Sequence, residues 1–202
     1  MDYLFEYRAF SEVLYDALTE DAFYMAMESS VSGGPEQRRE AMLRYYDYSI
    51  REAREYGRLH RPNGKAFGVS IWSKPVGADL SRQMAEEKKA FLRKHMGHVS
   101  LSKYAEITGL MAEQTATVVP PDSWYLSIVG IAPPFQGQGL GGSLIRPILD
   151  RTDELGRHTF LETFTPRNMR FYERLGFKDA AGFLEPATAV EYRVMIREPS
   201  SR

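Results

Sequence analysis

The spacing of apolar residues predicts helices through much of the chain. Apolar positions recur every three or four residues, the period of an amphipathic helix, in several separate stretches. The clearest stretch starts at Pro35, a residue suited to a first helical turn, and stops before Gly57. One face of it carries Met42, Leu43, Tyr46, Ile50 and Ala53. We predict helices over 11–29 (one or two short ones), 35–56, 79–97, about 100–116 and 166–176, and a further helix after the glycine segment that carries Leu144, Ile145, Ile148 and Leu149.

Extended runs predict the strands. Asn63-Gly64 lies between two such runs within 58–75, a strong signal for a hairpin. The run WYLSIVGI at 124–131 is apolar at nearly every position, so we predict a strand buried on both faces. The other predicted strands cover 3–8, 158–164, 177–186 and 189–198, the last two forming a hairpin.

The order of these elements predicts the fold class. Helices and a hairpin come first, followed by the order β–α–β–α–β–β, which indicates an α/β fold with a mixed sheet. A length of 202 residues fits a single domain covering the whole chain. Pro147 falls inside one predicted helix and is expected to kink it, because it removes the hydrogen bond to the Ser143 carbonyl.

Composition narrows the function classes. The formal net charge is −1 and the chain has no long block of Lys and Arg, so we expect no nucleic-acid partner. No apolar run has the length of a signal peptide or a membrane span, so we expect a cytoplasmic protein without a membrane partner. Cysteine is absent and the four histidines lack metal-ligand spacing, so we expect neither a thiol nucleophile nor a metal site.

The segment VGIAPPFQGQGLGG at 129–142 predicts an anion-binding loop. It joins an apolar strand to a helix, where glycines allow close approach and backbone N–H groups face the ligand. Gly137, Gly139 and Gly142 also spell the dinucleotide pattern G-x-G-x-x-G, with Glu162 twenty residues later. The five residues between strand and first glycine, and the short chain that follows, argue against a dinucleotide fold.

A resemblance to a known family favours a different ligand. Gln136, Gly139 and Gly141 after an apolar strand resemble the pyrophosphate loop of the GNAT superfamily of N-acetyltransferases. Asn168 followed by the run 171–177 (FYERLGF) resembles the closing motif of that superfamily. The chain looks most similar to the puromycin N-acetyltransferase-like branch, over about residues 122–178.

The resemblance implies a fold, a co-substrate and site residues. The fold would be a mostly antiparallel mixed sheet flanked by helices, with acetyl-CoA bound by 122–178 and the acceptor by 1–116. Tyr172 would protonate the leaving thiolate, and Glu162 would act as base unless it pairs with Arg167 or Arg170. Trp124 is a candidate for the acceptor cleft, with core packing as its alternative. The implied acetyl-CoA contacts are Val129, Gly130, Ile131, Gln136, Gly137, Gln138, Gly139, Leu140, Gly141, Gly142 and Asn168.

The expected activity is direct transfer of an acetyl group from acetyl-CoA to a primary amine of a small molecule. Two alternatives remain open: acetylation of a protein or peptide, and a non-catalytic domain that binds acyl-CoA for regulation. The helices within 79–116 resemble an insertion, which we expect to form a lid over the acceptor. Either a monomer or a homodimer is expected.

Overall fold

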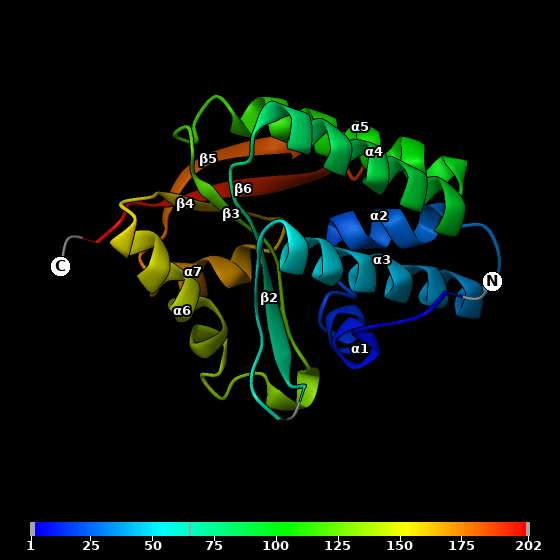
Figure 1. Ribbon diagram of the computed structural model, residues 1–202, viewed down its shortest axis with the longest axis horizontal. Coiled ribbons are helices and arrows are strands. Elements are labelled where there is room, and N and C mark those ends of the chain that lie inside the picture. The colour runs from blue at the N-terminus through cyan, green and yellow to red at the C-terminus, as the bar shows by residue number, and fades with distance from the viewer. Residues whose placement is uncertain (1–2, 65, 201–202) are drawn as a thin grey trace.

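A six-stranded sheet in the order β1-β2-β3-β4-β6-β5 organises the computed structural model, which describes residues 3–64 and 66–200 (Figure 1). All neighbouring strands are antiparallel except β3 and β4, which are parallel. The strands are β1 (Arg58–His60), β2 (Gly68–Ser73), β3 (Trp124–Ile131), β4 (Thr159–Thr163), β5 (Lys178–Glu185) and β6 (Val190–Arg197). The predicted mixed, mostly antiparallel sheet is therefore confirmed.

The helices follow the predicted order. The α-helices are α1 (Arg8–Ala17), α2 (Ala22–Ser30), α3 (Pro35–Glu55), α4 (Ala78–His95), α5 (His98–Thr115), α6 (Gly141–Glu154) and α7 (Met169–Glu173). Short 3-10 turns precede two of them, at Pro133–Phe135 and Pro166–Asn168. The predicted apolar face of α3 is buried at every position named for it, and α6 continues through Pro147. In Figure 1, α4 and α5 lie side by side at one end of the sheet, away from α6 and α7.

The hairpin predicted around Asn63-Gly64 is confirmed by the antiparallel pairing of β1 with β2. The connection is longer than the two-residue turn typical of that dipeptide, since it covers residues 61–67, and Lys65 lies outside the described residues. Gly57 precedes β1, and its backbone lies close to the backbone of β2. A Cβ at this position would lie 2.1 Å from the Trp72 carbonyl oxygen, so a larger residue would not fit.

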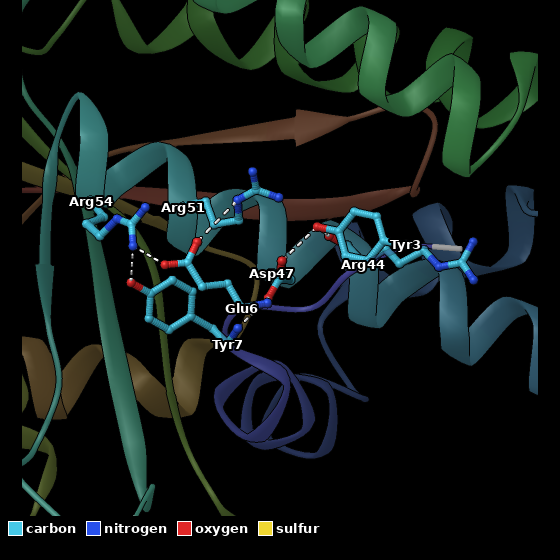
Figure 2. Close-up of polar contacts among 7 residues, drawn as sticks. All are labelled: Tyr3, Glu6, Tyr7, Arg44, Asp47, Arg51 and Arg54. Carbon is cyan, nitrogen blue, oxygen red and sulfur yellow. Dashed lines mark hydrogen bonds and ion pairs between the residues drawn. The ribbon is translucent and has the colours of Figure 1, made fainter. Parts of the chain in front are cut away.

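The strand predicted over 3–8 is wrong. Buried Asp47 on α3 binds this segment instead (Figure 2), accepting a hydrogen bond from the Tyr3 hydroxyl at 2.7 Å. Its other oxygen accepts from the backbone N–H groups of Glu6 and Tyr7, at 3.0 and 2.6 Å. Those donors precede the first turn of α1, so the segment's N–H groups are satisfied without a neighbouring strand. A contact forty residues away in the sequence thus overrides the local pattern.

The prediction that β3 is buried on both faces is wrong, because buried and partly exposed residues alternate along the strand. The strand also contains a bulge. The register with β2 shifts between Ile71 and Trp72, which places one extra residue, Ser127, in β3. Leu126 packs in the same cluster as α6 residues, whereas Ile128 packs with residues of α1 and α3. The bulge therefore changes which positions face each side. The partly exposed positions of β3 are Tyr125, Ser127, Val129 and Ile131.

The parallel strands β3 and β4 separate after their first three residues. Their pairing runs from Trp124 opposite Thr159 to Leu126 opposite Leu161. Beyond it, β3 pairs only with β2, and β4 pairs only with β6. The second half of β3 therefore has one edge without a strand partner, which opens the sheet beside the glycine segment.

Candidate functional site

A cavity of about 570 Å³ lies where the two strands separate, between the sheet and helices α2 to α5. Aromatic rings form part of its walls, among them those of Tyr24, Tyr45, Tyr104, Tyr125, Phe160 and Tyr172. The charged residues that line it are Asp21, Glu52, Lys74, Lys88 and Glu162. A mostly apolar cavity of this size with a few fixed polar groups is typical of a small-molecule site.

Glu162, the last but one residue of β4, is held in this cavity by two hydroxyl groups. Tyr125 donates a hydrogen bond to Oε2 at 2.8 Å, and Thr115 on α5 donates one to Oε1. Burial raises the pKa of Glu162, while both hydrogen bonds oppose that rise because they favour the ionised form. A carboxylate with a raised pKa is suited to accept a proton near neutral pH.

The ion pair that we considered as the alternative for Glu162 is not formed in the described part of the chain. Arg167 binds Glu20 at 2.7 Å instead, and both of those side chains are well exposed. Arg170 makes no ion pair with Glu162 among the described residues either. The Glu162 carboxylate is thus held by neutral donors inside the cavity.

Tyr172 on α7 is buried and lines the same cavity. Its ring packs near Phe171 and Phe177, with centroid distances of 5.1 and 6.1 Å. Burial and the negative charge of Asp21 raise the pKa of Tyr172, so the phenol stays protonated at neutral pH. Among the described residues, no side chain or backbone group forms a hydrogen bond with its hydroxyl, which therefore remains free to donate to a ligand.

Asp21 is a site residue that the sequence analysis missed. It caps α2, and its Oδ1 accepts hydrogen bonds from the N–H groups of Phe23 and Tyr24 at 3.0 and 3.4 Å. It lines the cavity and also a second hollow of about 320 Å³, to which Gln136 and Asn168 contribute. An aspartate before a helical stretch is a recognisable cap signal, but the sequence alone does not indicate that this carboxylate faces a cavity.

The glycine segment offers unpaired backbone donors. Gly137 and Gly139 have φ of +74° and +75°, a backbone conformation that glycine adopts without strain. Within the described residues, no acceptor is found for the N–H groups of residues 137–142, and no side chain caps the start of α6. Residues 136–139 are exposed, Leu140 and Gly142 are partly exposed, and Gly141 is buried. These are the features of an anion site at a helix N-terminus.

Of the remaining residues predicted to bind the co-substrate, one lines the cavity and others make contacts that hold the loop and the strand in place. Val129 lines the cavity, whereas Gly130 faces α1, where a Cβ would lie 2.8 Å from a methyl group of Leu14. The side chain of Gln136 donates to the Ile131 carbonyl at 2.9 Å, which folds the loop back on the strand. Gln138 similarly donates to the Pro134 carbonyl at 2.9 Å. Both glutamine side chains thus shape the loop.

Trp124 does not line the cavity. It is buried in a cluster with Trp72, Leu149 and Leu161, so core packing, the alternative considered for it, accounts for its position. The reason is the pleat of β3: Tyr125 faces the cavity, and its neighbour Trp124 therefore points to the other side of the sheet.

Helices α4 and α5 provide one wall of the cavity. Lys88 on α4 is buried, forms an ion pair with Glu52 of α3 at 2.9 Å, and lies 4.5 Å from the ring centre of Tyr48. From α5, Tyr104, Met111 and Thr115 face the same space. The segment predicted as a lid therefore borders the predicted acceptor space.

The described residues form neither a membrane-spanning helix nor a metal-binding cluster. No helix in residues 3–64 and 66–200 is long and apolar enough to cross a membrane. Within the same residues, no three histidine, aspartate or glutamate side chains gather in a way that could hold a metal ion.

Comparison with known proteins identifies the family to which the chain belongs. Residues 36–177 match the sequence profile of the Acetyltransferase (GNAT) family. An uncharacterized N-acetyltransferase of Schizosaccharomyces pombe is 35% identical over 81 residues. That match covers 39% of this chain and 33% of the yeast protein, so the chain matches about a third of its curated relative's length.

Solved structures with the same fold cover nearly the whole chain. A Corynebacterium glutamicum structure described as histone acetyltransferase HPA2 and related acetyltransferase superposes with a TM-score of 0.64 and 18% identity, over 96% of this chain and 91% of that one. Arylalkylamine N-acetyltransferase 2 of Aedes aegypti superposes with a TM-score of 0.59 and 13% identity, over 98% of both chains. At these identities the likeness concerns the fold alone.

Proposed function

Since the chain belongs to the acetyltransferase (GNAT) family, we propose that it transfers the acetyl group of acetyl-CoA to a primary amine of a small molecule. One observation carries the proposal. The cavity brings together Tyr172 of α7, Glu162 of β4 and Val129 of β3, which come from three separate elements. A proton donor and a proton acceptor beside the strand assigned to the co-substrate are what an acyl transfer to an amine requires.

The co-substrate would lie along the free edge of β3. Its pyrophosphate would bind the N–H groups of residues 137–142 at the start of α6, where no competing acceptor is found in the described chain. Its pantetheine arm would follow Val129 and Ile131 into the gap between β3 and β4. On this course the thioester would lie near the cavity, beside Tyr172.

The chemistry then needs two proton transfers. The amine nitrogen attacks the thioester carbonyl carbon, the C–S bond breaks, and the amide forms. Glu162 accepts the proton that the nitrogen loses, directly or through water. Tyr172 gives its phenolic proton to the leaving thiolate. The proton on Glu162 returns to Tyr172 through solvent. No acyl-enzyme is involved, because the sequence contains no cysteine and no nucleophilic serine motif.

The enclosed acceptor space favours a small molecule over a protein. Helices α4 and α5 wall the cavity, and its aromatic lining suits a compact amine with an apolar body. A protein acceptor would need a groove open along its length. The names of the two solved structures above include both kinds of acceptor, so the shared fold does not decide between them.

Calorimetry followed by an amine screen tests the proposal. Titration with acetyl-CoA should give micromolar binding that Gly139→Asp abolishes, because a carboxylate there repels the pyrophosphate. Thiol release in the presence of varied amines should then identify acceptors. Binding without thiol release for any small amine or peptide would favour the alternative of a non-catalytic acyl-CoA-binding domain. Tight binding of NADH without binding of acetyl-CoA would refute both the acetyltransferase proposal and the alternative of an acyl-CoA-binding domain.

A further inference from the structure

The carboxylate of Asp21 has one oxygen engaged and one oxygen free. Both hydrogen bonds from α2 go to Oδ1. Within the described residues no donor is found for Oδ2, and no lysine, arginine or histidine forms an ion pair with Asp21. The adjacent carboxylate differs, since Glu20 is exposed, lines only the second hollow and binds Arg167 at 2.7 Å. The α1–α2 connection thus directs one paired acid to the surface and one unpaired acid inward.

The position of Asp21 coincides with the expected site of reaction. It lies where the cavity and the second hollow meet, because it lines both, as do Leu18 and Asn168. The second hollow also includes Gln136 of the glycine segment. Asp21 and Tyr172 line the same cavity, and the negative charge of Asp21 adds to the effect of burial in raising the pKa of that phenol. Asp21 therefore lies between the proposed co-substrate arm and the aromatic cavity.

A carboxylate placed in this way is costly unless a cation joins it. Burial raises the pKa of Asp21, which means that its environment disfavours the charged form when no partner is present. Its helix cap does not require a charge, because asparagine and serine cap helices about as well as aspartate. Capping of α2 therefore does not explain why this position carries a negative charge. An ammonium ligand that pairs with Oδ2 would explain it.

We propose that Asp21 binds the ammonium group of the acceptor beside Tyr172, so that the enzyme selects alkylamines that are cationic at neutral pH and carry an aromatic or apolar body. The bound ammonium loses one proton to water before its nitrogen attacks, and Glu162 accepts the second proton as the amide forms. The inference rests on the proposed function, since it assigns the acceptor of that reaction. The aromatic walls around Tyr24, Tyr104 and Tyr125 would pack against the body of such an amine. Neutral amines, such as anilines, would lack the attraction to Asp21.

Binding of a matched pair of probes tests this selection. Phenethylamine is cationic at neutral pH, and 2-phenylethanol is its neutral counterpart of nearly the same shape. The wild type with CoA bound should prefer phenethylamine at least about tenfold in calorimetry, as expected for a hydrogen bond to a charged group. Asp21→Asn keeps the helix cap and should weaken phenethylamine binding by about 10- to 100-fold. Binding of 2-phenylethanol and acetyl-CoA should stay unchanged.

The adjacent acid supplies the matched control. Glu20→Gln removes one negative charge from the same connection, at the surface, and should leave the preference intact. Asp21→Ser, a second variant that retains a cap, should reproduce the effect of Asp21→Asn. Any of three results would overturn the assignment. Asp21→Asn could weaken the binding of both probes equally, it could leave the preference for phenethylamine unchanged, or the wild type could show no preference.

Failure of this inference differs from failure of the proposed function. If the enzyme acetylates anilines as well as alkylamines and Asp21→Asn slows neither selectively, acetyl transfer stands and Asp21 is only a cap. If no amine accepts an acetyl group and neither probe binds, the proposed function fails and the assignment of Asp21 fails with it.

Discussion

The Tyr125 hydroxyl lies 2.8 Å from Oε2 of Glu162 and donates a hydrogen bond to it. The tyrosine belongs to β3 and the glutamate to β4, near the point where these parallel strands stop pairing. Stacking of Tyr125 on Phe160, with ring centres 4.7 Å apart, fixes the phenol against the second strand. The sheet thereby positions one oxygen of the carboxylate, and Thr115 of α5 binds the other.

This hydrogen bond predicts a shift in the pH profile. Glu162 must be ionised to accept a proton, so kcat/KM should fall at acidic pH as its raised pKa is crossed. The Tyr125 hydroxyl favours the ionised form, so Tyr125→Phe should raise that pKa further and move the acidic limb to higher pH. The measurement is kcat/KM from about pH 5 to about pH 9. Tyr104→Phe, which alters the same cavity, should leave the limb in place; a limb unmoved by Tyr125→Phe would remove Glu162 as the base.

The same raised pKa predicts a pH-dependent stability. The folded protein holds the Glu162 proton more tightly than the unfolded chain, because burial disfavours the ionised form. The free energy of unfolding should therefore fall as pH rises from the ordinary carboxyl range through the raised pKa, and then stay level. Glu162→Gln removes this contribution. Urea unfolding at several pH values should give the variant the smaller loss between acidic and neutral pH, while its turnover drops by about 10²- to 10⁴-fold.

Replacing the phenol of Tyr172 separates catalysis from folding. Its hydroxyl has no hydrogen-bond partner within the described residues, so Tyr172→Phe removes a proton donor without breaking a structural contact. We expect kcat to fall by about 10²- to 10³-fold, with acetyl-CoA affinity and thermal stability close to wild type. Steady-state kinetics and calorimetry check this. Tyr24→Phe, at another phenol of the cavity wall, serves as the control, and unchanged turnover in Tyr172→Phe would support a non-catalytic domain.

Three glycines of the phosphate-binding segment should respond differently to alanine. Gly139→Ala places a side chain at φ +75° and should cost about 1–2 kcal/mol in backbone strain. Gly141→Ala would put a Cβ 2.8 Å from the ring of Phe171 and should shift α7, which carries Tyr172. Gly142→Ala meets only the flexible side chain of Arg146, at 3.4 Å, and should be tolerated. Acetyl-CoA affinity, turnover and thermal melting of the three variants test this order.

Local patterns predicted the elements, but not the contacts that combine them. The strand at 124–131 and the helix after it follow from apolar runs and from glycines that open a helix, and both are confirmed. The false strand at 3–8 and the missed Asp21 have a common cause, because each depends on a partner distant in the sequence. Asp47 binds the first segment from α3, and the cavity that Asp21 faces is closed by α4 and α5. The side of the sheet that Trp124 faces depends on which face of β3 borders the cavity, and the sequence of the strand does not indicate that.

The ion pair between Lys88 and Glu52 provides the last prediction. Both side chains are largely buried in the cavity wall, and the ammonium also lies over the ring of Tyr48. Lys88→Met leaves Glu52 without its partner and should destabilise the fold by about 3–5 kcal/mol, because an unpaired charge remains in an apolar wall. Glu52→Gln in the same chain removes that charge and should restore most of the loss.

Acceptor kinetics of the double variant then test the role of the helices. Lys88 of α4 pairs with Glu52 of α3, so a stable double variant changes the contact between these two helices and leaves the rest of the cavity wall in place. If α4 and α5 close over the acceptor, the acceptor KM should change in the double variant while the acetyl-CoA KM stays the same. Lys89→Met, at a neighbouring exposed lysine paired with Glu86, should change neither constant. Unchanged acceptor kinetics in a folded double variant would assign the ion pair to stability alone and would count against a lid formed by these helices.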